Sequence, residues 1–159
     1  MLYRALKKIA SVFFNILNIL LAGNLPPFGC VCVIVEAQDR YLALERPGGT
    51  LVFPGGFMRW KEQTVQTAQR EGKEETGLDL RIGEIVGYYS SPTDRFDGMS
   101  TLTLVYLADV ISGELRSSIE GCPCWLDENE LHVRLHAHYQ QIFNDYLRYR
   151  KQHQGANVS

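Results

Sequence analysis

Residues 55–78 of this chain read GGFMRWKEQTVQTAQREGKEETGL and combine a dense set of carboxylates with glycines at both ends. The acidic residues of the segment are Glu62, Glu71, Glu74 and Glu75. The last three stand at i, i+3 and i+4, so a helix would place them on one face. Like charges at that spacing repel each other unless a positive charge lies between them. Three carboxylates converging on one point favour a hard divalent cation with oxygen ligands, and Mg²⁺ is the common choice.

The spacing of these residues resembles the signature of the Nudix (MutT-like) hydrolases, G-x5-E-x7-R-E-U-x-E-E-x-G-U, where U is a bulky aliphatic residue. The matching positions are Gly56, Glu62, Arg70, Glu71, Glu74, Glu75, Gly77 and Leu78. Fixed residues at fixed offsets make this a specific motif. The one departure is Gly72, where the family carries an aliphatic side chain. We expect a neighbour such as Phe53 or Trp125 to fill the space beside it.

The resemblance implies an α/β/α sandwich with a mixed β-sheet, which also agrees with the order of predicted strands and helices. It implies Mg²⁺ (or Mn²⁺) held by Glu71, Glu74 and Glu75 and by the backbone carbonyl of Gly55. It further implies that Arg70 orients these catalytic glutamates. Gly56, Glu62 and Gly77 support the motif, and Gly77 is expected to end a helix over residues 62–76.

This chemistry predicts a metal-dependent pyrophosphohydrolase. A diphosphate repels attacking water, and a divalent metal offsets that charge and lowers the pKa of the water. We expect a substrate in which a nucleoside diphosphate is linked to another moiety, of the ADP-ribose or nucleotide-sugar type. A nucleoside triphosphate pyrophosphatase and a non-catalytic sensor of nucleotide metabolites are the alternatives. A pure sensor would not need the complete glutamate set.

Further site residues are predicted outside the motif. Glu120 lies on a loop shortly before Trp125, where some members of the family place a metal ligand or general base. Either Glu71 or Glu120 could activate the water, and a solvent-facing loop glutamate is the alternative for Glu120. The loop around Arg95 resembles substrate loops of the family. There Arg95 could bind phosphate, and Tyr89 or Phe96 could stack on a base; a polar loop anchored by its aromatic residues is the alternative.

The composition bounds the class of protein. The chain has 159 residues, a length that one domain with a full core can use, and a net charge of −2. It has no general basic field, so no nucleic-acid polymer is expected as a partner. Four cysteines occur as two C-x-C pairs, a spacing that zinc sites rarely use, which favours core roles in a reducing cytoplasm. We divide the chain into a helix and linker (1–27), a hydrolase domain (28–150) and a disordered tail (151–159).

The first 22 residues, MLYRALKKIASVFFNILNILLA, predict an amphipathic helix. Its polar residues recur as a stripe at Arg4, Lys8, Ser11, Asn15 and Asn18. The apolar run is shorter than a bilayer requires, and its end does not resemble a signal-peptide cleavage site. The helix could pack on the domain, form a dimer interface or lie peripherally on a membrane surface.

Overall fold

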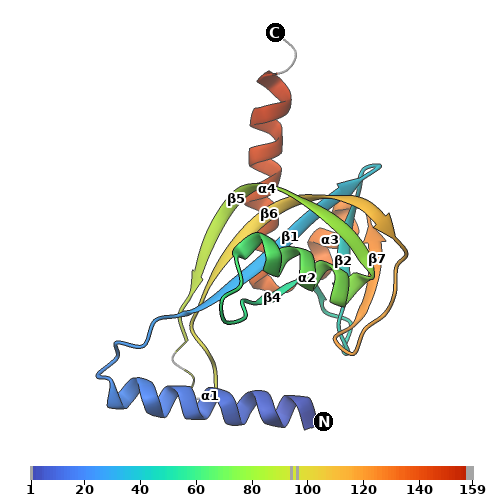
Figure 1. The fold of residues 1–159 in the computed structure, drawn as a ribbon. Coiled ribbons are helices and arrows are strands. Elements are labelled where there is room, and N and C mark those ends of the chain that lie inside the picture. Colours follow the sequence, from blue (N-terminus) through green and yellow to red (C-terminus); the bar gives the residue numbers. More distant parts are fainter. Residues whose placement is uncertain (1, 94, 96, 157–159) are drawn as a thin grey trace.

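The computed structural model describes residues 2–93, 95 and 97–156 (Figure 1). In chain order the elements are α1 (Leu2–Leu20), β1 (Phe28–Ala37), β2 (Arg40–Glu45), β3 (Leu51–Val52), β4 (Gly55–Phe57), α2 (Thr64–Thr76), β5 (Leu78–Ser91), β6 (Thr101–Gly113), β7 (Cys122–Leu126), α3 (Glu128–Arg134) and α4 (Ala137–Ala156). The sheet has the order β3-β2-β1-β6-β5, while β4 pairs with β1 and β7 pairs with β2. The β1–β6 pair is parallel and the other pairs are antiparallel, so the sheet is mixed.

Strand β1 explains the three layers. Its residues 31–35 are all buried, as the continuous apolar run of the sequence predicts. Successive side chains of a strand point to opposite faces. Accordingly Cys32 and Ile34 belong to the core beneath α3 and α4, whereas Val31 and Val33 belong to the core beneath α2.

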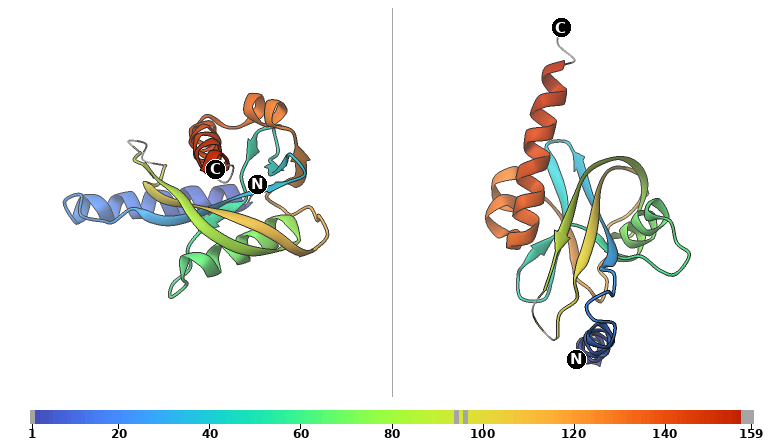
Figure 2. Two further views of the ribbon diagram at one scale, coloured as in Figure 1. Left: turned by 90° about the horizontal axis from the view of Figure 1, so that it is seen from above. Right: turned by 90° about the vertical axis from the view of Figure 1, so that its left-hand side faces the viewer.

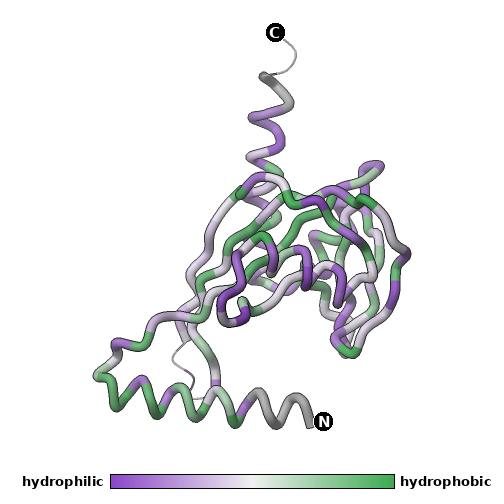
Figure 3. The backbone as a smooth tube through the Cα atoms, viewed as in Figure 1, coloured by the Kyte–Doolittle hydropathy of each residue, from purple (hydrophilic) through white to green (hydrophobic). Residues whose placement is uncertain are grey.

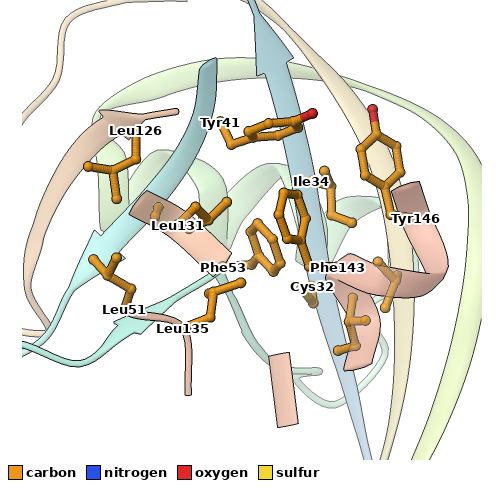
Figure 4. Packing of buried hydrophobic residues seen from close by; sticks show 13 residues of the cluster. Cys32, Ile34, Tyr41, Leu51, Phe53, Leu126, Leu131, Leu135, Phe143 and Tyr146 are labelled. Carbon is orange, nitrogen blue, oxygen red and sulfur yellow. The ribbon is translucent and has the colours of Figure 1, made fainter. Parts of the chain in front are cut away.

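The two cores lie on opposite faces of the sheet (Figure 2). The first contains Phe53 and Tyr41 from the sheet side and Phe143 and Tyr146 from α4, in edge-to-face and stacked contacts (Figure 4). The second joins Ala68 of α2 to Leu80 and Tyr106 of the sheet. This arrangement confirms the predicted α/β/α sandwich with a mixed sheet.

The motif helix α2 begins two residues later than expected. Gln63 is its N-cap, and the Gln63 N–H donates to the side chain of Gln66 at 2.9 Å. Glu62 lies just outside the helix because its carboxylate accepts hydrogen bonds from the backbone of Arg59 and the hydroxyl of Thr67. The helix ends as predicted at Gly77, whose left-handed backbone (φ 80°) suits glycine.

The C-terminal region differs from the sequence expectation. The apolar pattern after Asp127 is typical of one continuous helix, but the structure has two, with α3 ending at Arg134 and α4 beginning at Ala137. The predicted disordered tail is wrong for residues 151–156, which continue α4, while residues 157–159 lie outside the described part of the chain. Arg150 anchors this end of α4 because it donates to Glu36 at 2.8 Å and to Glu128 at 2.9 Å.

Gly72 allows close contact between α2 and β5. A Cβ atom at this position would lie 2.5 Å from Cδ1 of Leu80. Leu80 therefore occupies the space that an aliphatic side chain on α2 would use. The expectation that Phe53 or Trp125 fills it is wrong: the nearest atoms to this position all belong to Leu80, and Phe53 packs on the other face of the sheet.

This contact predicts coupling between Gly72 and Leu80. Gly72→Leu should lower the free energy of unfolding by about 1–3 kcal/mol through overpacking. Leu80→Ala should lower it by about 2–5 kcal/mol through a cavity. In the double variant the new leucine fills that cavity, so the combined loss should be smaller than the sum by about 1 kcal/mol or more. Urea unfolding of the four proteins measures this, and additive losses would contradict the packing described.

Candidate functional site

Glycines 55 and 56 bring the backbone of β4 against the last turns of α2. Gly55 pairs with Cys32 of β1, and a Cβ atom there would lie 2.1 Å from the carbonyl oxygen of Val31. A Cβ atom on Gly56 would lie 2.5 Å from the Glu71 carboxyl carbon. Any side chain larger than hydrogen would thus displace β4 or the Glu71 carboxylate. The two glycines form a cradle in which acidic groups of α2 contact the strand backbone.

Glu75 is the most deeply placed of the motif glutamates, with only 3% of its surface exposed. Its Oε2 accepts a hydrogen bond of 2.8 Å from the Gly55 N–H. Its Oε1 is buried and has no hydrogen-bond partner among the described residues. Burial, reinforced by the charges of Glu120 and Glu71, raises the pKa of Glu75 to about 8. A buried carboxylate with one oxygen unsatisfied is a group that gains from a cation.

Arg70 joins the motif residues into one network. Its Nε and Nη2 donate to the two oxygens of Glu62 at 2.7 and 2.8 Å. Its Nη1 donates to Glu71 at 2.6 Å, and Nη2 also donates to the Phe57 carbonyl at 3.1 Å. The hydrogen bonds from Arg70 lower the pKa of Glu62 to about 2. The eight-residue separation between Arg70 and Glu62 is bridged because Glu62 lies in the loop before α2 and not on the helix.

The sequence predicts that the three helix glutamates converge on one point. In the structure they do not. Glu74 points to solvent, where Arg59 donates to it at 3.0 Å and Arg70 at 3.2 Å. Mutual repulsion favours this separation, and each carboxylate accepts a hydrogen bond from an arginine or a backbone N–H. Among the described residues, no group of three or more His, Cys, Asp or Glu side chains is arranged to hold a metal ion already.

Glu120 is brought to the same region from the loop before β7. Its charge raises the pKa of both Glu71 and Glu75, for which burial is the larger cause. Arg46 lies beside it, with 3.6 Å between Nη2 of Arg46 and Oε2 of Glu120. Sequence reasoning missed Arg46. Only the register of β2 with β7, in which Glu45 is opposite Cys122, shows that the following arginine lies near Glu120.

The predicted substrate residues are not gathered at this site. The Tyr89 hydroxyl donates to Asp145 at 3.0 Å and its ring contacts His138, so this side chain packs against α4. Arg95 is exposed and paired with Asp97 at 3.1 Å. Phe96 lies outside the described residues. Phosphate binding by Arg95 and base stacking by Tyr89 or Phe96 therefore stay predictions.

The residues present fit a divalent metal. The oxygen atoms available are those of Glu71, Glu75 and Glu120, with the Gly55 backbone beside them, and hard cations such as Mg²⁺ prefer such ligands. The buried, unpartnered Oε1 of Glu75 is the specific feature that a cation would satisfy. Almost half of the Glu74 side chain is exposed, so it is the outermost of the motif glutamates.

Comparisons with known proteins agree with this geometry. The model of the NUDIX domain family matches residues 26–146. An ADP-ribose pyrophosphatase of Methanocaldococcus jannaschii is 33% identical over 131 residues, covering 79% of this chain and 76% of that protein. A MutT-like protein of Streptomyces ambofaciens is 30% identical over 115 residues, covering 69% of this chain and 71% of that protein.

Solved structures share the same fold. A NUDIX hydrolase from Nitrosomonas europaea superposes with a TM-score of 0.68 at 23% identity, covering 76% of this chain and 88% of its own. The MutT protein of Methanosarcina mazei Go1 gives a TM-score of 0.65 at 20% identity, covering 80% of this chain and 98% of that protein. With the motif, the three-layer fold and the family match in agreement, this chain belongs to the Nudix hydrolases, enzymes that act on the pyrophosphate bonds of nucleotide compounds.

Proposed function

We propose that this chain is a metal-dependent pyrophosphohydrolase whose substrate is a nucleoside diphosphate linked to another moiety, of the ADP-ribose or nucleotide-sugar type. The observation that carries the metal dependence is the buried Glu75 carboxylate, with one oxygen on the Gly55 N–H and the other unsatisfied among the described residues. The substrate class is supported by the relative named as an ADP-ribose pyrophosphatase. A reducing cytoplasm is part of the proposal and is supported by four free thiols.

Glu71, Glu75, Glu120 and the Gly55 carbonyl are the groups that would hold Mg²⁺ or Mn²⁺, with Glu74 at their exposed side. When bound, the metal would offset phosphate charge and lower the pKa of water. Arg70 holds Glu71 in position through the 2.6 Å hydrogen bond, while Glu62 fixes the guanidinium from its other edge. Helix α2 keeps Glu71 and Glu75 in place more rigidly than a loop could.

Two carboxylates can accept the proton of the attacking water. Glu71 lies over Gly56 and accepts a hydrogen bond from Arg70, while burial raises the pKa of its carboxyl group. Glu120 lies on a loop beside Arg46. Arg46 can also contact a phosphate oxygen, since a guanidinium recognises phosphate and this one lies next to the acidic groups. Substitution of each glutamate by glutamine, with pH–rate profiles, distinguishes the two bases.

The first test is a substrate screen. Full-length protein with Mg²⁺ should release product fastest from ADP-ribose or a UDP-sugar within a panel that also holds NTPs and dinucleotide polyphosphates. Preference for an NTP with release of pyrophosphate would support the alternative, a nucleoside triphosphate pyrophosphatase. No turnover of any compound would contradict an enzymatic role and leave the metabolite sensor.

Glu75→Gln should lower kcat by about 10²-fold or more, because a metal ligand acts on charge that develops in the transition state. Mg²⁺ should raise the unfolding temperature of the wild type and leave that of the variant unchanged. The variant should fold normally, since glutamine can still accept from the Gly55 N–H and resembles the protonated carboxyl group that burial favours. Glu84→Gln, on exposed β5 surface, is the matched control. Undiminished turnover by the Glu75 variant would refute the assignment.

Gly56→Ala tests the cradle beneath Glu71. The added methyl group would displace a carboxylate now 2.5 Å from its position, so kcat/KM should fall by about tenfold or more. The free energy of unfolding should change by less than about 1 kcal/mol, because the obstructing group is a side-chain end. Steady-state kinetics with thermal unfolding measure both. Wild-type kcat/KM would show that Glu71 does not need its present position.

Arg70→Lys tests the network itself. Lysine keeps the charge and loses the planar fork that contacts Glu62 and Glu71 together, so kcat/KM should fall by about 10²-fold. The free energy of unfolding should fall by about 1–3 kcal/mol. Arg81→Lys is the control, since Arg81 and Asp109 form an exposed pair for which a near-zero effect is expected. Equal effects of the two substitutions would show that Arg70 is an ordinary ion-pair residue.

A further inference from the structure

Helix α1 turns its apolar face away from the protein. Large apolar side chains that lie 45% to 76% exposed are Ile9, Phe13, Ile16, Ile19, Leu20 and Leu21. Four of them, at positions 9, 13, 16 and 20, follow the i, i+4, i+7, i+11 spacing of one helix face. Figure 3 shows that the coloured part of α1 consists mainly of hydrophobic residues. Leaving so much apolar surface in water is unfavourable. An exposed apolar face of this kind marks a site of interaction with another surface.

The face of α1 that carries part of the polar stripe, together with Phe14, contacts the domain and the linker. The side chain of Asn15 donates to the Gly98 carbonyl at 2.8 Å, and Asn18 accepts from the Leu25 N–H at 3.1 Å. Ser11 is buried on the same side, and Phe14 packs edge-to-face on Phe28 with 4.7 Å between ring centroids. These contacts fix the rotation of the helix about its axis. Of the three alternatives for residues 1–22, packing on the domain is thus seen for the face that carries Ser11, Phe14 and Asn15.

The position of α1 leaves that face open to a flat surface. Figures 1 and 2 agree that α1 lies at one end of the molecule, opposite the end from which α4 projects. The rest of the protein lies on one side of the helix only. Among the described residues, no helix is both long and apolar enough to cross a membrane. The geometry is that of a helix lying along a surface.

Charge distinguishes a lipid surface from a second copy of the chain. Arg4, Lys7 and Lys8 are the only charged residues before Glu36, so residues 1–35 carry +3, while the rest has 13 basic and 18 acidic residues and carries −5. Packing two α1 helices together would bring two like-charged segments into contact, whereas an anionic bilayer would attract each of them. Lys8 is mostly exposed although it pairs with Asp97 at 3.8 Å.

The size of the exposed apolar face of α1 also favours a lipid surface over a second copy of the chain. A helix of 19 residues is about 28 Å long and offers a contact strip about 10 Å wide. A stable interface between two proteins buries about 800 Å² on each partner, more than such a strip supplies. A bilayer needs no matching surface, because the side chains enter the headgroup region individually.

We propose that the exposed apolar face of α1 binds the surface of an anionic lipid bilayer, with the helix axis in the plane of the membrane and the hydrolase domain held on its aqueous side. The claim is independent of the substrate proposed above. It also places the loop of residues 97–100, which contacts α1, close to the bilayer.

Flotation of the full-length protein with vesicles tests the proposal. Wild type should bind vesicles that contain phosphatidylserine and bind pure phosphatidylcholine vesicles less. Phe13→Ser combined with Ile16→Ser should weaken binding by about tenfold or more, because several buried CH₂ equivalents are lost. Ile111→Ser combined with Val133→Ser, two exposed apolar positions elsewhere, is the matched control and should bind like the wild type. Arg4→Gln with Lys7→Gln should weaken binding to anionic vesicles and reduce its sensitivity to salt.

Sedimentation velocity without lipid completes the experiment. Monomeric wild type that floats with anionic vesicles supports the proposal. Wild type that remains in the lipid-free fraction would overturn it, as would a Phe13/Ile16 double variant that floats as well as wild type. If the wild type dimerises, the Phe13/Ile16 double variant is monomeric and the wild type does not bind vesicles, the apolar face is assigned to a second copy of the chain. Equal unfolding temperatures of all variants exclude misfolding as the cause, and activity in solution should be the same for wild type and variants.

Discussion

The guanidinium of Arg70 is the positive charge on which the acidic end of helix α2 depends. It donates to Glu62, Glu71 and Glu74 and to one backbone carbonyl of β4. Without this guanidinium, the carboxylates at i, i+3 and i+4 of α2 would repel one another and destabilise the end of the helix. Arg70 thus stabilises a concentration of negative charge that a folded protein otherwise avoids. Hydrogen bonding to these partners raises the pKa of the guanidinium, so it stays charged.

Glu75 is stabilised differently, and the difference matters for chemistry. It receives no hydrogen bond from Arg70 and depends on the Gly55 N–H, in a position that the cores of the sandwich define. Strand β1 pairs with β4 on one edge and with β6 on the other, and its own side chains pack α2 from beneath. The sheet therefore fixes the distance between the glycine backbone and the acidic helix. Burial raises the pKa of this carboxyl group, and a cation beside its unsatisfied oxygen would favour the ionised form, so the position is suited to cation binding.

Much of this could be predicted from the sequence because its signals are local. Offsets between Gly56, Glu62, Arg70 and the three glutamates specify a helix, its cap and its acidic face. The valine-rich strand and the sandwich follow from hydrophobic patterns. Other features depend on register or on tertiary contact. Arg46 reaches Glu120 only through the β2–β7 pairing, and Leu80 meets Gly72 only because β5 follows α2 closely. The pattern of α1 defines two faces, but it cannot say which of them contacts the domain.

Manganese offers the most direct measurement of whether these acidic groups form one cation site. Crystals soaked in Mn²⁺, with diffraction recorded near the manganese absorption edge, locate the ion by its anomalous signal. The account predicts a peak bounded by Glu71, Glu75 and the Gly55 carbonyl, with Oε1 of Glu75 as a ligand. A fully soaked crystal with no peak there, or with manganese only on carboxylates remote from α2, would contradict it.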